Sequence, residues 1–121
     1  MKKIIILLLV LIAGIFYPEK ATEKSLKGLP TFLKITVLND MGEAEEGTKI
    51  QLFETEQDYN KESNPVNTRY TNKRGKTTFG KLRPTVYYIL ARKEGMNNDL
   101  GAVKTDTLRE GLINKVTVII R

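Results

Sequence analysis

The side chains on which enzymes most often build nucleophiles and metal sites are missing from this chain of 121 residues, because it contains neither His nor Cys. Without them there is no Ser–His–Asp triad, no thiolate nucleophile and no ordinary zinc site. A pair of carboxylates can still hydrolyse a glycosidic bond, but most acidic residues here lie in polar segments that are typical of turns and loops. We therefore predict no catalytic residue and no cofactor, and keep a small carboxylate-based hydrolase as an alternative.

A basic segment, Lys73-Arg74-Gly75-Lys76, is the first candidate for ligand binding. The cations of Lys73, Arg74 and Lys76 could bind the anionic group of a glycan, a lipid headgroup or a phosphate. The alternative is a solvated hairpin tip, on which basic side chains maintain solubility. Nucleic acid is not an expected partner, because no motif with a stacking aromatic platform is evident.

Two apolar residues, Tyr88 and Leu90, are the second candidate. If Tyr87 points into the core, the alternation of a strand makes Tyr88 and Leu90 point outward. Such an outer face would suit a partner protein or a glycan. The alternative is packing beneath the long polar connection over residues 54–67. Four other large apolar residues share the predicted outward parity: Phe32, Leu38, Phe53 and Ile119.

The loop over residues 93–99 offers several oxygen atoms that could hold Ca²⁺, from Glu94, Asn97, Asn98 and Asp99. Their spacing does not match an EF-hand loop. We interpret the segment as an Asn-rich turn and predict no metal site.

Short strands must position these candidates, because apolar and polar residues alternate with a period of two along most of the chain after residue 31. No convincing amphipathic helix is present, although a short helical turn is expected near residues 57–59. The pattern predicts an all-β fold, a single antiparallel Ig-like or prealbumin-like β-sandwich of about seven strands over residues 32–121. The clearest expected strands cover residues 32–38, 48–53, 69–71, 76–79, 85–92 and 115–120.

The N-terminus has the pattern of a secretory signal peptide. Lys2 and Lys3 precede an apolar run over residues 4–17, and a basic segment followed by such a run is typical of these peptides. As a helix the run would be about 21 Å long, short of a ~30 Å hydrocarbon core. We expect residues 1–21 to be the signal peptide and residues 22–31 a linker. The chain would then be exported to the periplasm or the cell surface, with only transient membrane contact unless the run is retained as an anchor.

Several stretches of the sequence resemble the exported carboxypeptidase-regulatory-like modules, which are prealbumin-like (transthyretin-like) β-sandwiches similar to collagen-adhesin B-type repeats. The resemblance begins at Leu33-x-Ile35-x-Val37 and Asn39-Asp40-x-Gly42. It continues through residues 47–52, 71–79 and 82–91. It departs from the family pattern at Asn72, where Asp is usual, and at Thr85, where Gly is usual.

The resemblance implies a β-sandwich that acts as a spacer, an interaction module or a carbohydrate-handling accessory, with catalysis in another domain. From the residues and the resemblance together we expect an exported, non-catalytic binding or scaffolding module at the bacterial cell envelope. Its partner would be an envelope protein or a glycan. The alternative is a carbohydrate-binding accessory protein that uses the outer aromatic face.

Overall fold

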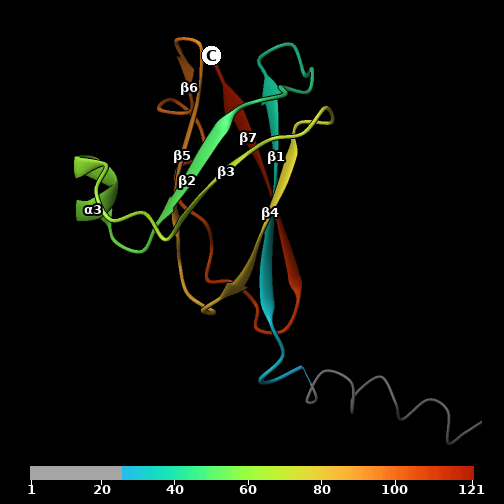
Figure 1. The fold of residues 1–121 in the computed structure, drawn as a ribbon, viewed down its shortest axis with the longest axis vertical. Coiled ribbons are helices and arrows are strands. Elements are labelled where there is room, and N and C mark those ends of the chain that lie inside the picture. Colours follow the sequence, from blue (N-terminus) through green and yellow to red (C-terminus); the bar gives the residue numbers. More distant parts are fainter. Residues whose placement is uncertain (1–25) are drawn as a thin grey trace, which may run out of the picture.

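The computed structural model describes residues 26–121, so the predicted signal peptide over residues 1–21 lies outside the described residues. Two sheets face each other to form a β-sandwich (Figure 1). One sheet has three strands in the order β4-β1-β7, and the other has four in the order β3-β2-β5-β6. Within residues 26–121, no helix is both long and apolar enough to cross a membrane.

The predicted fold class is confirmed, since the described chain consists of seven strands and one short helix. The structure bears out the short helical turn expected near residues 57–59. In chain order the elements are β1 (Thr31–Asn39), β2 (Lys49–Phe53), α3 (Glu56–Lys61), β3 (Asn67–Tyr70), β4 (Lys76–Leu82), β5 (Tyr88–Lys93), β6 (Met96–Asn97) and β7 (Ile113–Ile120).

One pair of strands corrects the prediction of a wholly antiparallel sandwich. Strands β1 and β7 run parallel, in a continuous register from Phe32 beside Ile113 to Asn39 beside Ile120. All the other strand pairs in the two sheets are antiparallel. Alternation of apolar residues fixes which face of a strand is buried, but it carries no information about the direction of the neighbouring strand.

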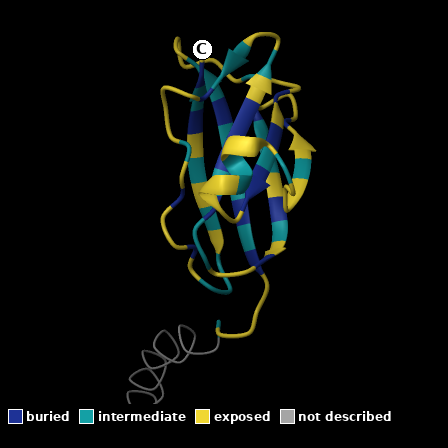
Figure 2. Ribbon diagram, turned by 90° about the vertical axis from the view of Figure 1, so that its left-hand side faces the viewer, coloured by how far each residue is buried: buried dark blue, intermediate teal, exposed yellow. Residues whose placement is uncertain are grey.

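The core lies between the two sheets and follows the alternation of the strands (Figure 2). On β1, Leu33, Ile35 and Val37 are completely buried. The four-stranded sheet opposes them with Ile50, Leu52, Ile89 and Ala91, all of which are also completely buried. This interdigitation of two inner faces is the usual source of stability in a sandwich that has no disulfide.

Tyr87 points into this core, as the sequence predicts, and is 1% exposed. Its hydroxyl group accepts a hydrogen bond from the backbone N–H of Arg83 at 3.0 Å and donates one to the Arg83 carbonyl at 3.2 Å. Burial raises the pKa of the Tyr87 phenol. The polar tip of the largest buried side chain is therefore satisfied by backbone from the connection before β5.

The helix α3 packs on the outer face of the four-stranded sheet, against β2 and β5 (Figures 1 and 2). It begins where Thr55 accepts a hydrogen bond from the N–H of Asp58 at 3.1 Å, an ordinary N-cap arrangement. It ends at Glu62, whose left-handed backbone directs its N–H back to the helix carbonyls. Within the described residues 26–121, the three-stranded sheet carries no such helix on its outer face.

Candidate functional site

The basic segment predicted as a ligand site forms a tight turn between β3 and β4. These two strands belong to different sheets, so the turn crosses between the sheets and is not the tip of a β-hairpin, as the sequence suggested. The side-chain oxygen of Asn72 accepts hydrogen bonds from the backbone N–H groups of Arg74 at 2.9 Å and Lys76 at 3.0 Å. Its backbone carbonyl accepts a third from Gly75 at 2.9 Å. These bonds fix the turn, so the directions in which Arg74 and Lys76 leave the backbone are set by Asn72.

Gly75 attaches this turn to β1. It has a φ of 72°, a positive value that glycine adopts without steric cost. Its carbonyl accepts a hydrogen bond from the N–H of Val37 at 2.7 Å. A Cβ atom at this position would stand only 2.5 Å from the Val37 carbonyl oxygen, so the close approach requires glycine.

A hollow of about 430 Å³ lies where this turn meets the outer face of the three-stranded sheet. Three cationic side chains line it: Lys34 from β1, Arg74 from the turn and Lys76 from β4. Tyr70, at the end of β3, lines it too and is 63% exposed. Asn72, Thr77 and Thr78 complete the lining. We call this group the basic hollow.

Of the three basic residues predicted for this site, Arg74 and Lys76 line the basic hollow, whereas Lys73 is exposed and does not. Sequence reasoning missed Lys34 and Tyr70. Lys34 comes into place because β1 pairs with β4, with Lys34 beside Thr78. That register depends on residues far apart in the sequence. The one sequence signal was that Lys34 is a polar residue in an apolar strand, at a position where the alternation makes its side chain point outward.

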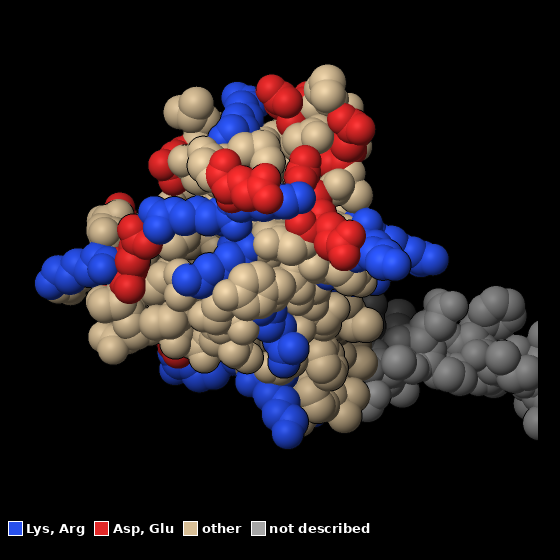
Figure 3. Space-filling view, turned by 45° about the horizontal axis from the view of Figure 1, so that its top comes forward, with Lys and Arg blue, Asp and Glu red and all other residues tan. Residues whose placement is uncertain are grey.

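The positive charge of the basic hollow is not balanced by an acidic residue in its lining, because no carboxylate lines it. The three ion pairs recorded within residues 26–121 use the cations Arg83, Arg92 and Lys93, none of which belongs to the hollow. In Figure 3 the acidic side chains gather toward the upper part of the view, while the charged side chains in the lower part are mostly Lys and Arg. Three cations beside an aromatic ring can hold an anionic group and stack on a flat or ring-shaped neighbour.

The second candidate, Tyr88, belongs to an aromatic cluster beneath α3. Tyr59 from the helix lies between Phe53 and Tyr88, with ring centroids 6.0 Å from each and an edge-on arrangement against Phe53. Burial raises the pKa of the Tyr59 phenol, and the nearby negative charge of Asp99 raises it further. The ammonium group of Lys104 stands 5.8 Å from the Tyr88 ring centroid, a weak cation–π contact.

Leu90 corrects the expectation of an open apolar face. It has the predicted outward parity, yet it is only 4% exposed, and Phe53 on the neighbouring strand is fully buried. The helix α3 covers this face, because the connection over residues 54–67 folds back over β2 and β5. The packing alternative is therefore the one observed, and Leu90 is not accessible to a ligand in this structure.

Asn98, which was considered as a calcium ligand, has a structural role. Its buried side chain accepts a hydrogen bond from the N–H of Ala91 at 2.9 Å and donates to the carbonyls of Ile89 at 2.9 Å and Ala102 at 3.0 Å. These bonds attach the loop after β6 to β5. Within residues 26–121 no group of three or more His, Cys, Asp or Glu side chains could hold a metal ion.

Comparison with known proteins shows the fold but no family. No protein-family model matches the chain, and no curated protein matches it in sequence. Among solved structures, it resembles part of the TIE protein of Bacillus anthracis (TM-score 0.58, 19% identity), over 77% of this chain and 16% of that one. It also resembles part of a streptococcal ancillary pilin (TM-score 0.57, 16% identity), over 78% of this chain and 33% of that one.

The class that the structure defines is thus a β-sandwich domain of the kind found within these two longer bacterial proteins. The chain matches only a third or less of each of their lengths. At identities below 20% the likeness concerns the fold. A third match, to hydroxyquinol 1,2-dioxygenase from Pseudomonas putida, has a TM-score of 0.47 and carries no argument about function.

Proposed function

We propose that the chain is an exported, non-catalytic binding or scaffolding module of the bacterial cell envelope. The observation that carries the proposal is the basic hollow, in which Lys34, Arg74 and Lys76 meet without a carboxylate. The basic and apolar N-terminal pattern supports export. The fold shared with part of an ancillary pilin supports a role at the cell surface.

The ligand that best fits the basic hollow is an anionic glycan. Lys34, Arg74 and Lys76 would pair with its carboxylate or phosphate groups, and the guanidinium group of Arg74 can do so through two parallel hydrogen bonds. The exposed ring of Tyr70 lies at the same hollow and would stack on a sugar ring. A turn that served only solubility would not need the aromatic ring or the lysine from β1.

The carbohydrate-accessory alternative through Tyr88 loses support, since α3 covers most of the face on which it was expected. The hydrolase alternative gains none from the two hollows described in the structure. Asp106 is the one carboxylate that lines either of them, whereas glycoside hydrolysis requires two facing carboxyl groups.

The proposal is tested by titrating the full chain with polyanionic and neutral glycans of matched length, using calorimetry at low and high salt. We expect binding to the polyanionic glycan only, weakened by salt because the contacts are ionic. The double variant Lys34→Gln, Lys76→Gln should bind about a hundredfold more weakly or worse, because it removes two charged contacts that are each worth about 1.5–3 kcal/mol.

A matched control is Lys61→Gln, which removes a positive charge from α3, away from the basic hollow. It should leave the affinity nearly unchanged. If Lys61→Gln weakens binding as much as the substitutions in the hollow do, net charge alone drives association. In that case, or if neutral glycans bind equally well, the assignment of the site is wrong.

A further inference from the structure

The four edge strands of the sandwich differ in how open their edges are. Strand β3 has four residues and β6 has two. Strand β4 is longer, but its pairing with β1 is irregular near Gly80 and Lys81, where Lys81 has a φ of 54°. Strand β7 has eight residues in an unbroken register with β1. Short or bulged edges discourage pairing with another chain, whereas a long regular edge permits it.

The backbone of β7 presents alternate residues to its free edge. The N–H of Phe32 donates to the carbonyl of Leu112 at 3.0 Å, so in this parallel register the even-numbered residues of β7 bond to β1. The odd-numbered ones face away. Arg121, an odd-numbered residue, agrees with this alternation, because its N–H and carbonyl both bond to Asn97 of β6, away from β1, at 3.0 Å.

Three residues therefore direct unused backbone groups to the edge: Ile113, Lys115 and Thr117. Within residues 26–121 no hydrogen bond to their N–H groups or carbonyls is recorded outside the pairing of β7 with β1. Further along, the carbonyl of Ile119 lies close to Gly101, so the loop after β6 closes that part. The open stretch thus runs from Ile113 to Thr117.

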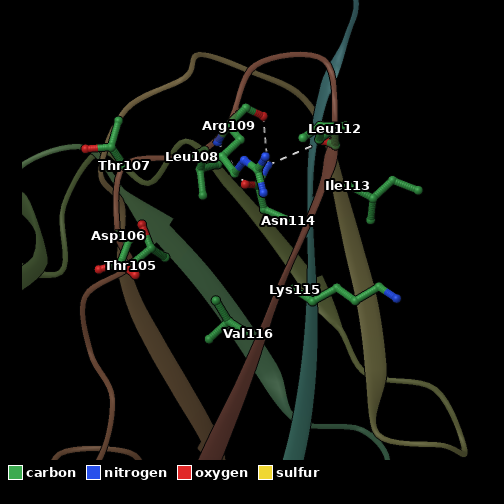
Figure 4. A pocket seen from close by; sticks show the side chains of 10 residues that line it. All are labelled: Thr105, Asp106, Thr107, Leu108, Arg109, Leu112, Ile113, Asn114, Lys115 and Val116. Carbon is green, nitrogen blue, oxygen red and sulfur yellow. Dashed lines mark hydrogen bonds between the residues drawn. The ribbon is translucent and has the colours of Figure 1, made fainter. Parts of the chain in front are cut away.

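A groove of about 370 Å³ lies beside this open stretch (Figure 4). One wall is the start of β7, and the other is the segment over residues 105–109. That segment is held to the opposite sheet, where the N–H of Thr105 bonds to the Tyr87 carbonyl at 2.9 Å. Leu108, Leu112 and Val116 supply apolar surface to the groove. It would receive apolar side chains from a strand laid along β7.

The outward side of the same edge is basic. Lys115 lies on the outer face of β7, directly beside Lys34 of β1 in the parallel register. Arg109 lines the groove on its other wall. A strand added to β7 would place alternate side chains opposite Lys115, where acidic residues are favoured and basic ones are not. Two β7 edges of this chain, paired with each other, would instead gather four lysines on one face.

We propose that the β7 edge, from Ile113 to Thr117, is a docking site for an extended segment of a partner protein in which apolar and acidic residues alternate. The partner strand would continue the three-stranded sheet, with backbone hydrogen bonds to Ile113, Lys115 and Thr117. Its apolar side chains would fill the groove beside Leu108 and Val116, and its acidic ones would face Lys115. This site shares no lining residue with the basic hollow, although Lys115 lies beside Lys34.

The experiment titrates the full, isotopically labelled chain with a short synthetic peptide in which Val and Glu alternate, and follows amide hydrogen exchange by NMR. We expect slower exchange at the amides of Lys115 and Thr117 when the peptide is added. Asn114 and Val116, whose amides already bond to β1, should change little. A peptide in which Val and Lys alternate should bind at least about tenfold more weakly, because like charges oppose each other.

The sharpest variant is Thr117→Pro, which removes an edge-facing N–H without disturbing the bonds to β1. It should abolish peptide binding, while Thr117→Val, which keeps the N–H, should retain it. Lys115→Glu should reverse the preference between the two peptides and serves as a second test should the proline variant fail to fold.

Two results would overturn the proposal. One is an unchanged exchange pattern at saturating peptide. The other is a dimer in light scattering whose Lys115 and Thr117 amides are protected without any peptide, since a second copy would then cover the edge.

Discussion

The outer faces of the two sheets have similar alternating sequences but different surfaces. On the four-stranded sheet, α3 covers Phe53 and Leu90, and Arg92 is paired with Glu62. On the three-stranded sheet, Lys34, Lys76 and Lys115 take part in no ion pair recorded within residues 26–121. One face is covered by a helix of the chain itself, and the other carries basic side chains without such a cover in residues 26–121.

The largest expected effect of a substitution lies on the covered face. Phe53→Ala removes a fully buried ring from the cluster beneath α3 and should lower the free energy of unfolding by about 3–5 kcal/mol. Chemical denaturation measures the change. Phe32→Ala, which removes a half-buried ring from the other sheet's outer face, should cost clearly less. If both variants lose the same free energy of unfolding, the two outer faces do not differ in how much their aromatic residues stabilise the fold.

The next effect concerns the turn between β3 and β4 that shapes the basic hollow. Gly75→Ala forces a side chain against the Val37 carbonyl at a positive φ, and should cost about 1–3 kcal/mol and weaken glycan binding as well. Gly95→Ala, which has a positive φ but open space around it, should cost less and leave binding intact. Thermal unfolding measures the stability of the two variants, and calorimetry measures their affinity for the glycan.

A smaller effect on stability is expected from the double variant Lys34→Gln, Lys76→Gln. Neither side chain is buried or in a recorded ion pair, so the free energy of unfolding should change by no more than about 0.5 kcal/mol. Denaturation midpoints measure it. A loss of several kcal/mol would mean that these lysines support the fold, and the hollow would then be structural.

The smallest effect is a pH dependence where the loop after β1 meets the end of β5. Hydrogen bonds from Lys93 and then from Asn39 hold the pKa of Glu45 below its ordinary value of 4.5. The unfolded chain therefore binds this proton more readily, so the contribution is present above about pH 4.5 and is lost as the pH falls through the lowered pKa. Glu45→Gln should flatten that part of the stability profile. If the loss of stability at acidic pH is the same in the variant, the proposed contribution of the Glu45–Lys93 pair is wrong.

Much of the fold follows from the sequence, because alternation along β1, β2 and β7 marks the buried side of each strand. Tyr87 and the turn at Gly75 are likewise local features, so their roles could be predicted. The parallel pairing of β1 with β7 is not local, and neither is the register that brings Lys34 to Arg74 and Lys76.

The candidate site was predicted only in part for the same reason. Arg74 and Lys76 form a contiguous basic segment and could be recognised, whereas Tyr70 and Lys34 join them through tertiary pairing. Leu90 was misjudged, because the parity of a residue does not reveal whether a distant loop covers it. The helix α3 has only six residues and no buried one, which leaves little amphipathic signal to predict where it packs.

The parallel pairing of β1 and β7 also has a mechanical consequence. The described chain enters β1 at one end of the molecule and leaves β7 at the other (Figure 1). A force applied through the residue before Thr31 and through Arg121 would slide the two strands along each other. The hydrogen bonds between them would then share the load in shear instead of opening one after another. A domain built in this way resists stretching, which suits a module held under tension between two attachment points.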